Sequence, residues 1–269
     1  MSYLEGFVLG FQDTGEYDRR FSLLSEKQGK MTAVCKSILK PRAKLAGHLD
    51  FPNLVWLELV WSIRGWQITQ ALEKLSYPAL RQNAVSLRAS LKAAEFLREM
   101  LFSQSEAGNR DRNYIYYLDN LQGDSDLAAQ HKQIFSLWQE FLSQLEFYAG
   151  QAQEPKADAE FLSSQLVLKV LQVLGFVPDI FTCANCGQTL KRLNSNPPAQ
   201  AGKVGYYENQ FFCENCAVKL RLPAQELYVS SLVLASQVLK GVWLPDSSFK
   251  NEVIEISRLF KNQSHLSMV

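Results

Sequence analysis

The feature that most constrains this chain is a pair of Cys-x-x-Cys motifs. Cys183 and Cys186 form the first motif, and Cys213 and Cys216 form the second. A two-residue spacer lets both sulfurs of one motif reach the same ion, so two such motifs supply four tetrahedral thiolate ligands. The spacing therefore predicts one structural Zn²⁺ ion, because four cysteines leave no coordination position open for catalysis.

The segment between the two motifs, residues 187–212, is longer than the spacing of about 15–20 residues that is usual in zinc ribbons. Residues 194–205 include two prolines and two glycines, which indicates a loop, and residues 206–212 predict a short strand. The alternative is a redox or disulfide pair of the thioredoxin type, but that motif needs a βαβ setting and does not come as a matched pair. We therefore expect a zinc-binding insert at about residues 181–218.

The cysteine content and the N-terminal residues indicate which cellular compartment the protein occupies. Cys35 is the one cysteine outside the motifs, which argues against a disulfide framework and for a reducing environment. Residues 1–5 contain no basic segment followed by an apolar one, and no apolar run reaches about 18 residues. We expect a cytoplasmic protein with no membrane partner, whose 269 residues, 47% of them hydrophobic, can form two domains.

The first 75 or so residues predict a small β-barrel. Strand patterns occur at residues 3–11, 19–25, 31–35, 54–61 and 66–72, with one long connection after the third strand. Five strands with this spacing favour an OB-fold barrel, and an SH3-like barrel is the nearest alternative.

Positive charge is concentrated in this region although the net charge of the chain is only +1. No acidic residue occurs from Lys27 to Leu49. OB barrels commonly bind single strands on the second and third strands and on neighbouring loops, so the run favours nucleic-acid contact over a merely solvated face. Aromatic residues that could stack on bases, although strand aromatics are more often core, are Phe7, Phe11, Tyr17, Phe21, Trp56, Trp61 and Trp66.

Helical periodicity replaces the strand pattern from Pro78 onward. Helices are predicted at residues 85–101, 113–121, 124–149, 161–174, 223–239 and 249–260, with a linker at 150–158 and Gly175 as a C-cap. The expected fold is thus α+β and multidomain: an OB-fold barrel at residues 1–78, and a helical domain at 79–269 that carries the zinc-binding insert.

The residue patterns of an enzyme are missing. The sequence lacks a G-x-x-x-x-G-K-[ST] phosphate loop, and His48, His131 and His265 are scattered, so we expect each on the surface or in a loop. Paired carboxylates such as Asp124 and Asp126 fit the first turn of a helix better than a two-metal nuclease site. We expect no catalytic activity.

A series of short motifs between residues 15 and 37 resembles the motifs of a known protein family. Gly15-Glu16-Tyr17-Asp18-Arg19, then Leu23-Leu24, Gly29-Lys30 and Lys36, resembles in order and spacing the motifs of the RecO family of bacterial recombination mediators. The resemblance covers nearly the whole chain, zinc motifs included. The family's A-K-G appears here as Cys35-Lys36-Ser37, which keeps the lysine and loses the glycine of the local turn.

The resemblance implies a DNA repair and homologous recombination protein of the cytoplasm and nucleoid. It would bind single- and double-stranded DNA, anneal complementary strands, and work with RecR and the single-strand-binding protein to load RecA. Backbone contacts are expected from the matched positions Arg19, Arg20, Lys30 and Lys36, to which the charge run adds Lys27, Lys40, Arg42 and Lys44.

The zinc site is expected to brace the helical domain. Its formal charge of about −2 could be balanced by Lys191, Arg192, Lys219 and Arg221, which could also extend the DNA surface. Two other classes of protein stay open. One is a protein adaptor without intrinsic DNA binding, and the other is a zinc-ribbon enzyme that cleaves nucleic acid with divalent metal.

Overall fold

The chain forms two compact units, Met1–Lys156 and Ala157–Val269. The computed structural model describes residues 2–101, 125–151, 156–190, 203–208, 210–221, 225–228, 232, 235, 237–240, 243–244 and 250–267. The helix predicted at residues 113–121 and most of the loop predicted at 194–205 lie outside the described residues. The expected division into domains at residues 78 and 79 stays a prediction.

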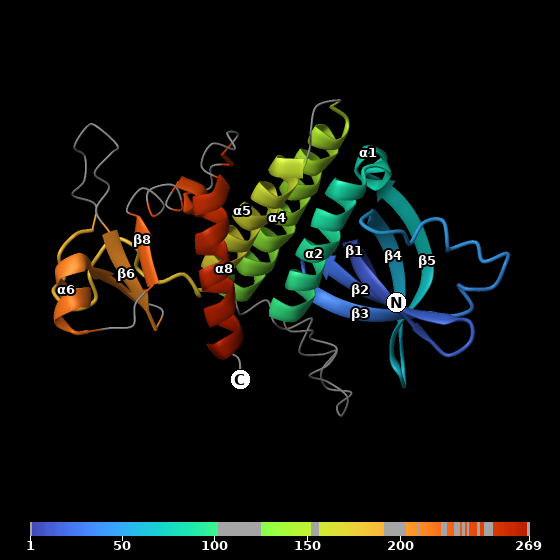
Figure 1. Cartoon of the computed structure of the whole chain (residues 1–269). Helices are drawn as coiled ribbons and strands as arrows, with labels where there is room; N and C mark the ends of the chain where they lie inside the picture. Colours follow the sequence, from blue (N-terminus) through green and yellow to red (C-terminus); the bar gives the residue numbers. More distant parts are fainter. Residues whose placement is uncertain are drawn as a thin grey trace. The chain divides into compact units, whose positions relative to one another are not determined.

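Five strands form a closed barrel in the first unit (Figure 1). The order around the barrel is β1-β2-β3-β5-β4, with β4 returning to pair with β1, which is the arrangement of an OB fold and confirms the predicted architecture. The strands are β1 (Ser2–Thr14), β2 (Asp18–Ser25), β3 (Gly29–Cys35), β4 (Leu54–Ser62) and β5 (Gly65–Leu75).

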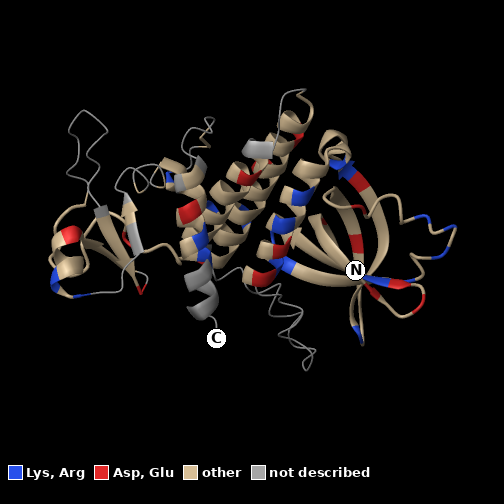
Figure 2. Ribbon diagram, viewed as in Figure 1, with Lys and Arg blue, Asp and Glu red and all other residues tan. Residues whose placement is uncertain are grey.

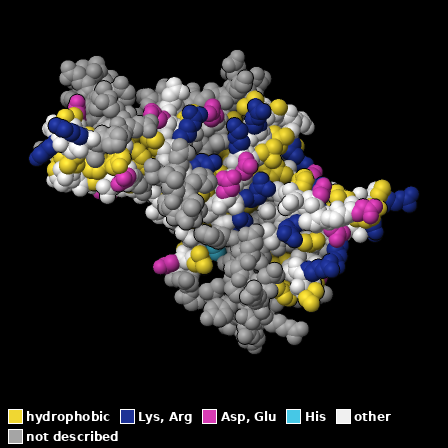
Figure 3. Space-filling model, turned by 60° about the horizontal axis from the view of Figure 1, so that its bottom comes forward, with side chains coloured by type: hydrophobic (Ala, Val, Ile, Leu, Met, Phe, Trp, Pro, Cys, Tyr) yellow, Lys and Arg dark blue, Asp and Glu magenta, His cyan; other side chains and the backbone are white. Residues whose placement is uncertain are grey.

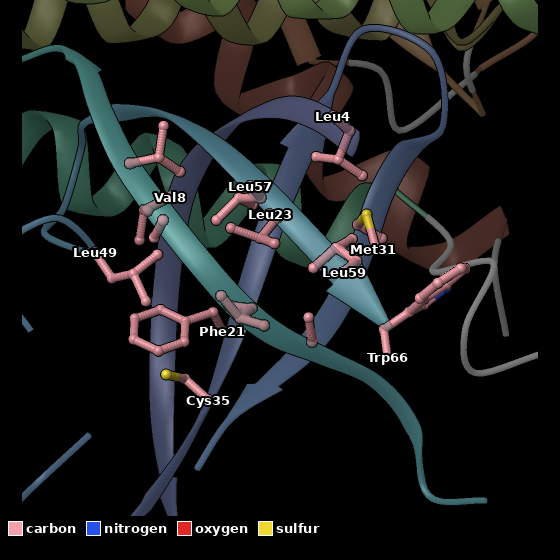
Figure 4. Packing of buried hydrophobic residues seen from close by; sticks show 14 of the residues in the cluster. Leu4, Val8, Phe21, Leu23, Met31, Cys35, Leu49, Leu57, Leu59 and Trp66 are labelled. Atoms are coloured by element: carbon pink, nitrogen blue, oxygen red, sulfur yellow. The ribbon is translucent and has the colours of Figure 1, made fainter. Parts of the chain in front are cut away.

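Alternation along the strands fills the barrel with hydrophobic side chains. In β3 every second residue is buried, so Met31, Ala33 and Cys35 point inward. Phe21 and Leu23 enter from β2, and Figure 4 shows these side chains converging with residues of β1, β4 and β5. The interior is therefore a packed core rather than a ligand cavity.

Helices cover one outer face of the barrel within the same unit. They are α1 (Pro78–Gln82), α2 (Ala84–Met100) and α4 (Ser125–Ala149). The ring centroids of Phe7 on β1 and Phe135 on α4 lie 5.0 Å apart. Because helices pack on its outer side, the stretch Gly6–Leu9 of β1 is buried on both faces.

The long connection between β3 and β4, residues 36–53, is fixed where it returns to the barrel. Arg81 on α1 pairs with Asp50, with 2.9 Å between guanidinium nitrogen and carboxylate oxygen. The Asn53 N–H donates to the carbonyl of Asp50 at 2.9 Å. Ile38 and Leu49 are buried in the barrel core, so both ends of this connection are anchored.

The second unit combines helices with a small sheet. Helix α5 (Lys156–Val173) ends at Gly175, whose φ of +79° and hydrogen bond to Gln172, together with the Phe176 to Leu171 bond, form a Schellman cap as predicted. The sheet has the order β7-β6-β8. Its strands are β6 (Lys203–Tyr207), β7 (Gln210–Cys213) and β8 (Gln225–Tyr228), and the helices after β7 include α6 (Glu214–Lys219) and α8 (Lys250–Ser267).

Two expectations for this unit need correction. The predicted strand at 206–212 is a hairpin, because β6 and β7 pair through Tyr207 and Gln210. The predicted helix from Pro223 is wrong at its start, since Gln225–Tyr228 pairs with β6 and buries Leu227 in the sheet. A four-residue strand has too little alternation to be recognised, and its pairing partner decides its structure.

Helices of sufficient length and apolarity to cross a bilayer are absent from the part of the chain that the structure describes.

Candidate functional site

The turn between β1 and β2 and the start of the β3–β4 connection are joined at one end of the barrel. We call this region, residues 11–20 and 35–44, the loop end. Asp18 Oδ1 accepts a hydrogen bond of 2.7 Å from the N–H of Ser37, and the carbonyl of Tyr17 accepts one of 3.0 Å from Leu39. The matched motif Gly15 to Arg19 therefore fixes the position of the basic connection.

Ser37 occupies the place of the family's glycine and keeps a glycine-like conformation. Its φ is +56°, in the left-handed region that side chains with a Cβ disfavour. The hydrogen bond that the Ser37 N–H donates to Asp18 holds this backbone in place. The turn that Lys36 and Ser37 form is thus retained without the glycine.

Exposed cations gather on this loop end. Figure 2 shows the β3–β4 connection extending from the barrel, with Lys and Arg along its outer part. Figure 3 shows Lys and Arg side chains at the same edge of the barrel. Among the described residues none of these side chains forms an ion pair; they are Arg20, Lys36, Lys40, Arg42 and Lys44. Five of the eight predicted DNA-binding residues therefore lie in one exposed region.

Arg19 belongs to the same region but is engaged with neighbouring side chains. Its Nε lies 2.6 Å from Asp13 Oδ1, and its guanidinium carbon lies 3.8 Å from the ring centroid of Phe11. Only 23% of its side chain is exposed. Arg19 is therefore less available to a phosphate than Arg20, which is exposed.

The two remaining predicted residues, Lys27 and Lys30, lie at the opposite end of the β2–β3 hairpin, where Ser25 pairs with Gly29. Lys27 is exposed in the turn. The Lys30 ammonium donates to the carbonyl of Arg98 and, at 2.7 Å, to that of Leu101, so it caps the C-terminus of α2. Lys27 and Lys30 belong to the same acid-free stretch of sequence as the cations of the loop end, but the length of the β2–β3 hairpin separates them from it in space.

His131 packs beside the β2–β3 turn, and its position differs from the expectation of a histidine on the surface or in a loop. It lies on α4 rather than in a loop, is half-buried, and packs so closely on Gly29 that a Cβ there would stand 2.5 Å from its Nε2. Burial lowers the pKa of His131 below its usual value. His48 lies in the β3–β4 connection as expected, and the side chain of His265 is outside the described residues.

The structure separates the candidate aromatic residues into core and surface. Phe7 and Phe21 are fully buried, and Trp66 is 9% exposed. Phe11 and Tyr17, at the loop end, are 45% and 42% exposed. Of the two half-buried tryptophans, Trp56 stacks against Tyr3 and Trp61 packs edge-on against Trp66.

The four motif cysteines meet in the second unit. Cys183 and Cys186 come from a turn closed by the Gly187 N–H, which donates to the Cys183 carbonyl at 2.9 Å. Cys213 ends β7 and is the N-cap of α6, which places Cys216 in the first turn of that helix. All four Sγ atoms lie within 4.8 Å of one another, so the two motifs form one cluster.

The geometry of this cluster fits a tetrahedral metal ion. Thiolates about 2.3 Å from zinc stand about 3.8 Å apart, and the Sγ atoms of Cys186 and Cys213 are 3.9 Å apart. Backbone and side-chain donors also point at the sulfurs: the Cys213 N–H donates to Cys183 Sγ and Asn185 Nδ2 to Cys216 Sγ, both at 3.3 Å. Such donors stabilise thiolates and are typical of metal–cysteine sites.

Two thiols of the cluster, those of Cys183 and Cys213, have strongly shifted pKa values. Burial raises the pKa of Cys183, but hydrogen bonds from the backbone of Cys186, Cys213 and Asn185 outweigh it and lower the pKa to about 6. Burial raises the pKa of Cys213 to about 12. A bound cation would favour the thiolate form at both positions.

Of the four cations expected to balance the cluster's negative charge, two are among the described residues. Lys219 and Arg221 are exposed at the end of α6 and just after it. Lys191 and Arg192 lie outside the described residues. Their proposed part in the site stays a prediction.

Comparison with known proteins gives two family matches. The family model for the N-terminal part of recombination protein O matches residues 1–74, which is the barrel. The model for its C-terminal part matches residues 126–257, which include the four cysteines.

Similar curated proteins carry one name. The DNA repair protein RecO of Desulfitobacterium hafniense is 26% identical over 275 residues, which cover 97% of this chain and 84% of that protein. RecO of Heliobacterium modesticaldum is 23% identical over 202 residues, covering 75% of this chain and 62% of its own length. RecO of Acaryochloris marina is 28% identical over 200 residues, covering 73% and 57%.

Proposed function

The chain belongs to the recombination protein O (RecO) family, and from this premise we propose that it is a mediator of DNA repair and homologous recombination. In this proposal it binds single- and double-stranded DNA, anneals complementary strands, and helps load a recombinase onto DNA coated by single-strand-binding protein. It does so without catalysing a reaction. RecR, the single-strand-binding protein and, indirectly, RecA are the protein partners that the family implies.

The observation that supports this proposal best is the exposed basic surface of the loop end. The β3–β4 connection carries Lys36, Lys40, Arg42 and Lys44 with no acidic residue between them. A cation without an ion-pair partner is available to neutralise a phosphate, and the counterions released from DNA supply affinity. Contacts of this kind position the backbone and are indifferent to base sequence.

Annealing follows from the same electrostatics. Two complementary strands repel each other through their phosphates, and a cationic surface bound to both lowers that repulsion. Pairing of the bases then supplies the free energy, so no nucleotide hydrolysis is required. The basic connection extends from the barrel, which lets it contact more than one strand.

We also propose that the four cysteines hold one structural Zn²⁺ ion. Four thiolates close the coordination shell, so the ion contributes folding free energy rather than Lewis-acid chemistry. Cys183 and Cys186 would be joined through it to Cys213 and Cys216, which ties the first turn of α6 to the segment after α5.

The test is a triple charge reversal, Lys36→Glu, Lys40→Glu and Arg42→Glu, followed by fluorescence anisotropy of a labelled oligonucleotide across a salt series. We expect binding to be lost at moderate salt, with the circular dichroism spectrum unchanged because all three side chains are exposed. The milder variant Lys36→Gln should reduce the slope of log affinity against log salt by roughly 0.7 for a single strand.

The matched control reverses three exposed cations elsewhere, Arg88→Glu, Lys92→Glu and Lys240→Glu, which changes the net charge equally. Retained binding in the control with loss in the loop-end variant supports the proposal. Equal binding by the loop-end variant and the unaltered protein contradicts it. If the unaltered protein binds no DNA at low salt, the protein-adaptor alternative is favoured instead.

A further inference from the structure

Two aromatic rings at the loop end, those of Phe11 and Tyr17, are exposed to solvent, whereas the neighbouring ring of Phe21 is buried in the barrel core. Phe11 is 45% exposed and Tyr17 is 42% exposed, while Phe21, opposite Phe11 on β2, is fully buried. Burial of an aromatic ring is strongly favourable, so exposure of two rings in one region needs an explanation. Both rings adjoin the basic connection described above.

Each of these rings is paired with a cation. The guanidinium carbon of Arg19 lies 3.8 Å from the centroid of Phe11, and the Lys40 ammonium lies 5.3 Å from the centroid of Tyr17. Exposed rings within a cationic surface are the elements with which proteins bind unpaired bases, because a base stacks on the ring while nearby cations bind the phosphates. Arg19 is already engaged with Asp13 and with one face of Phe11, so the phosphate contacts are assigned to the exposed cations around it.

The rings are held in position by the fold. Phe11 packs against Phe21, with ring centroids 6.0 Å apart. The carbonyl of Tyr17 accepts a hydrogen bond from Leu39, which ties its turn to the basic connection. The Phe11 ring and the backbone of Tyr17 are therefore already ordered, which reduces the conformational entropy lost when a base stacks there.

The loop end carries six basic and three acidic residues, so it keeps a net positive charge. Asp13 pairs with Arg19, and Asp18 accepts the hydrogen bond from the backbone of Ser37. The Glu16 carboxylate hydrogen-bonds to the Tyr17 hydroxyl and raises the pKa of that hydroxyl, so the ring stays neutral. The loop end as a whole therefore keeps charge complementarity to an anionic strand.

We propose that Phe11 and Tyr17 stack on unpaired bases of a DNA single strand whose phosphates are bound by the surrounding cations. This inference rests on the proposed DNA-binding function and names the part of the ligand that these two residues take. Every base has a flat face, so stacking gives a preference for single strands over duplex without selecting a base sequence. A duplex keeps its bases stacked inside and would gain from the cations alone.

The test compares three labelled probes of equal length in anisotropy titrations: oligo-dT, an abasic strand with the same phosphates, and a duplex. We expect the unaltered protein to bind oligo-dT more tightly than the abasic strand. The double variant Phe11→Leu, Tyr17→Leu should lose that preference, with roughly 5-fold or more lost for each stacked base. Its affinity for the abasic strand and the duplex, and its salt slope, should not change.

Leucine keeps an apolar side chain against Phe21, and circular dichroism checks that the barrel is intact. The matched control is Phe147→Leu, which removes a 62%-exposed ring from α4 and should leave all three affinities unchanged. The single variant Tyr17→Phe keeps the ring and should retain most of the preference for oligo-dT.

The outcomes separate this inference from the proposed function. If the unaltered protein binds oligo-dT and the abasic strand equally, or if the double variant keeps the preference, the stacking inference is wrong while DNA binding stands. Equal loss of affinity for all three probes in the double variant also overturns it, because the rings would then support the surface rather than the bases. Failure of the unaltered protein to bind any probe contradicts the proposed function itself.

Discussion

Single residues of the family motif have structural tasks that the sequence did not reveal. Asp18 binds the backbone of Ser37, Arg19 covers Phe11, and Lys30 caps α2. The partners of Lys30 are 68 and 71 residues away in sequence, so no local pattern could predict them. The sequence shows the basic residues as one run, but which of them are engaged with other parts of the protein depends on tertiary contacts.

At this scale the first prediction concerns Ser37. Its left-handed conformation costs about 1–2 kcal/mol for a residue with a Cβ. Ser37→Gly removes this cost but adds entropy to the unfolded chain, so we expect the free energy of unfolding to rise by about 0.5 kcal/mol. Urea denaturation measures the difference, and the control Lys36→Gly, at a neighbouring position without positive φ, should instead reduce stability. A less stable Ser37→Gly variant would contradict the assignment of this turn.

Among the elements, those with clear periodicity were predicted well and those defined by pairing were not. All five barrel strands, α2 and α4 lie where the alternating or helical patterns indicated. Helix α5 was predicted from residue 161 but begins at Lys156, within the predicted linker at 150–158. Strand β8 was mistaken for the start of a helix, because Gln225–Tyr228 becomes a strand only through its pairing with β6. The cysteine cluster was predictable in full, since motif spacing alone specifies a common ligand set.

The junction of β3 with α2 gives the second prediction. Lys30→Met keeps the length of the side chain but removes the donor to the carbonyls of Arg98 and Leu101. We expect the free energy of unfolding to fall by about 1–3 kcal/mol, while the salt slope of DNA binding stays unchanged. Lys36→Gln should do the reverse, lowering the salt slope with little effect on stability. If Lys30→Met lowers the salt slope of DNA binding as much as Lys36→Gln does, Lys30 also contacts DNA.

For the whole molecule, the important fact is that the two candidate sites belong to different compact units. The loop end lies in Met1–Lys156 and the cysteine cluster in Ala157–Val269. A change in one unit need not alter the other, so unfolding is not expected to be a single two-state transition. The prediction at this scale follows from that separation.

Loss of the proposed Zn²⁺ ion should loosen the second unit and spare the barrel. Cys213→Ser removes one ligand, and we expect bound zinc to fall from about one per chain to none. Hydrogen exchange should accelerate in β6 and β7, while β1 to β5 keep their protection and oligonucleotide affinity is retained. The control Cys35→Ala alters a cysteine of the barrel core and should leave zinc content unchanged. Unaltered exchange in β6 and β7 after complete zinc loss would contradict a structural metal.

The anchored ends of the β3–β4 connection have a consequence for how such a protein can evolve. Asp18 fixes the first turn of the connection through Ser37, and Arg81 fixes its return through Asp50. Between these anchors Ile38 and Leu49 enter the barrel core, whereas residues 39–44 are mostly exposed and carry Lys40, Arg42 and Lys44. Mutations there can tune affinity for a ligand over generations at almost no cost to folding, so natural selection can adjust the strength of binding and the integrity of the barrel independently.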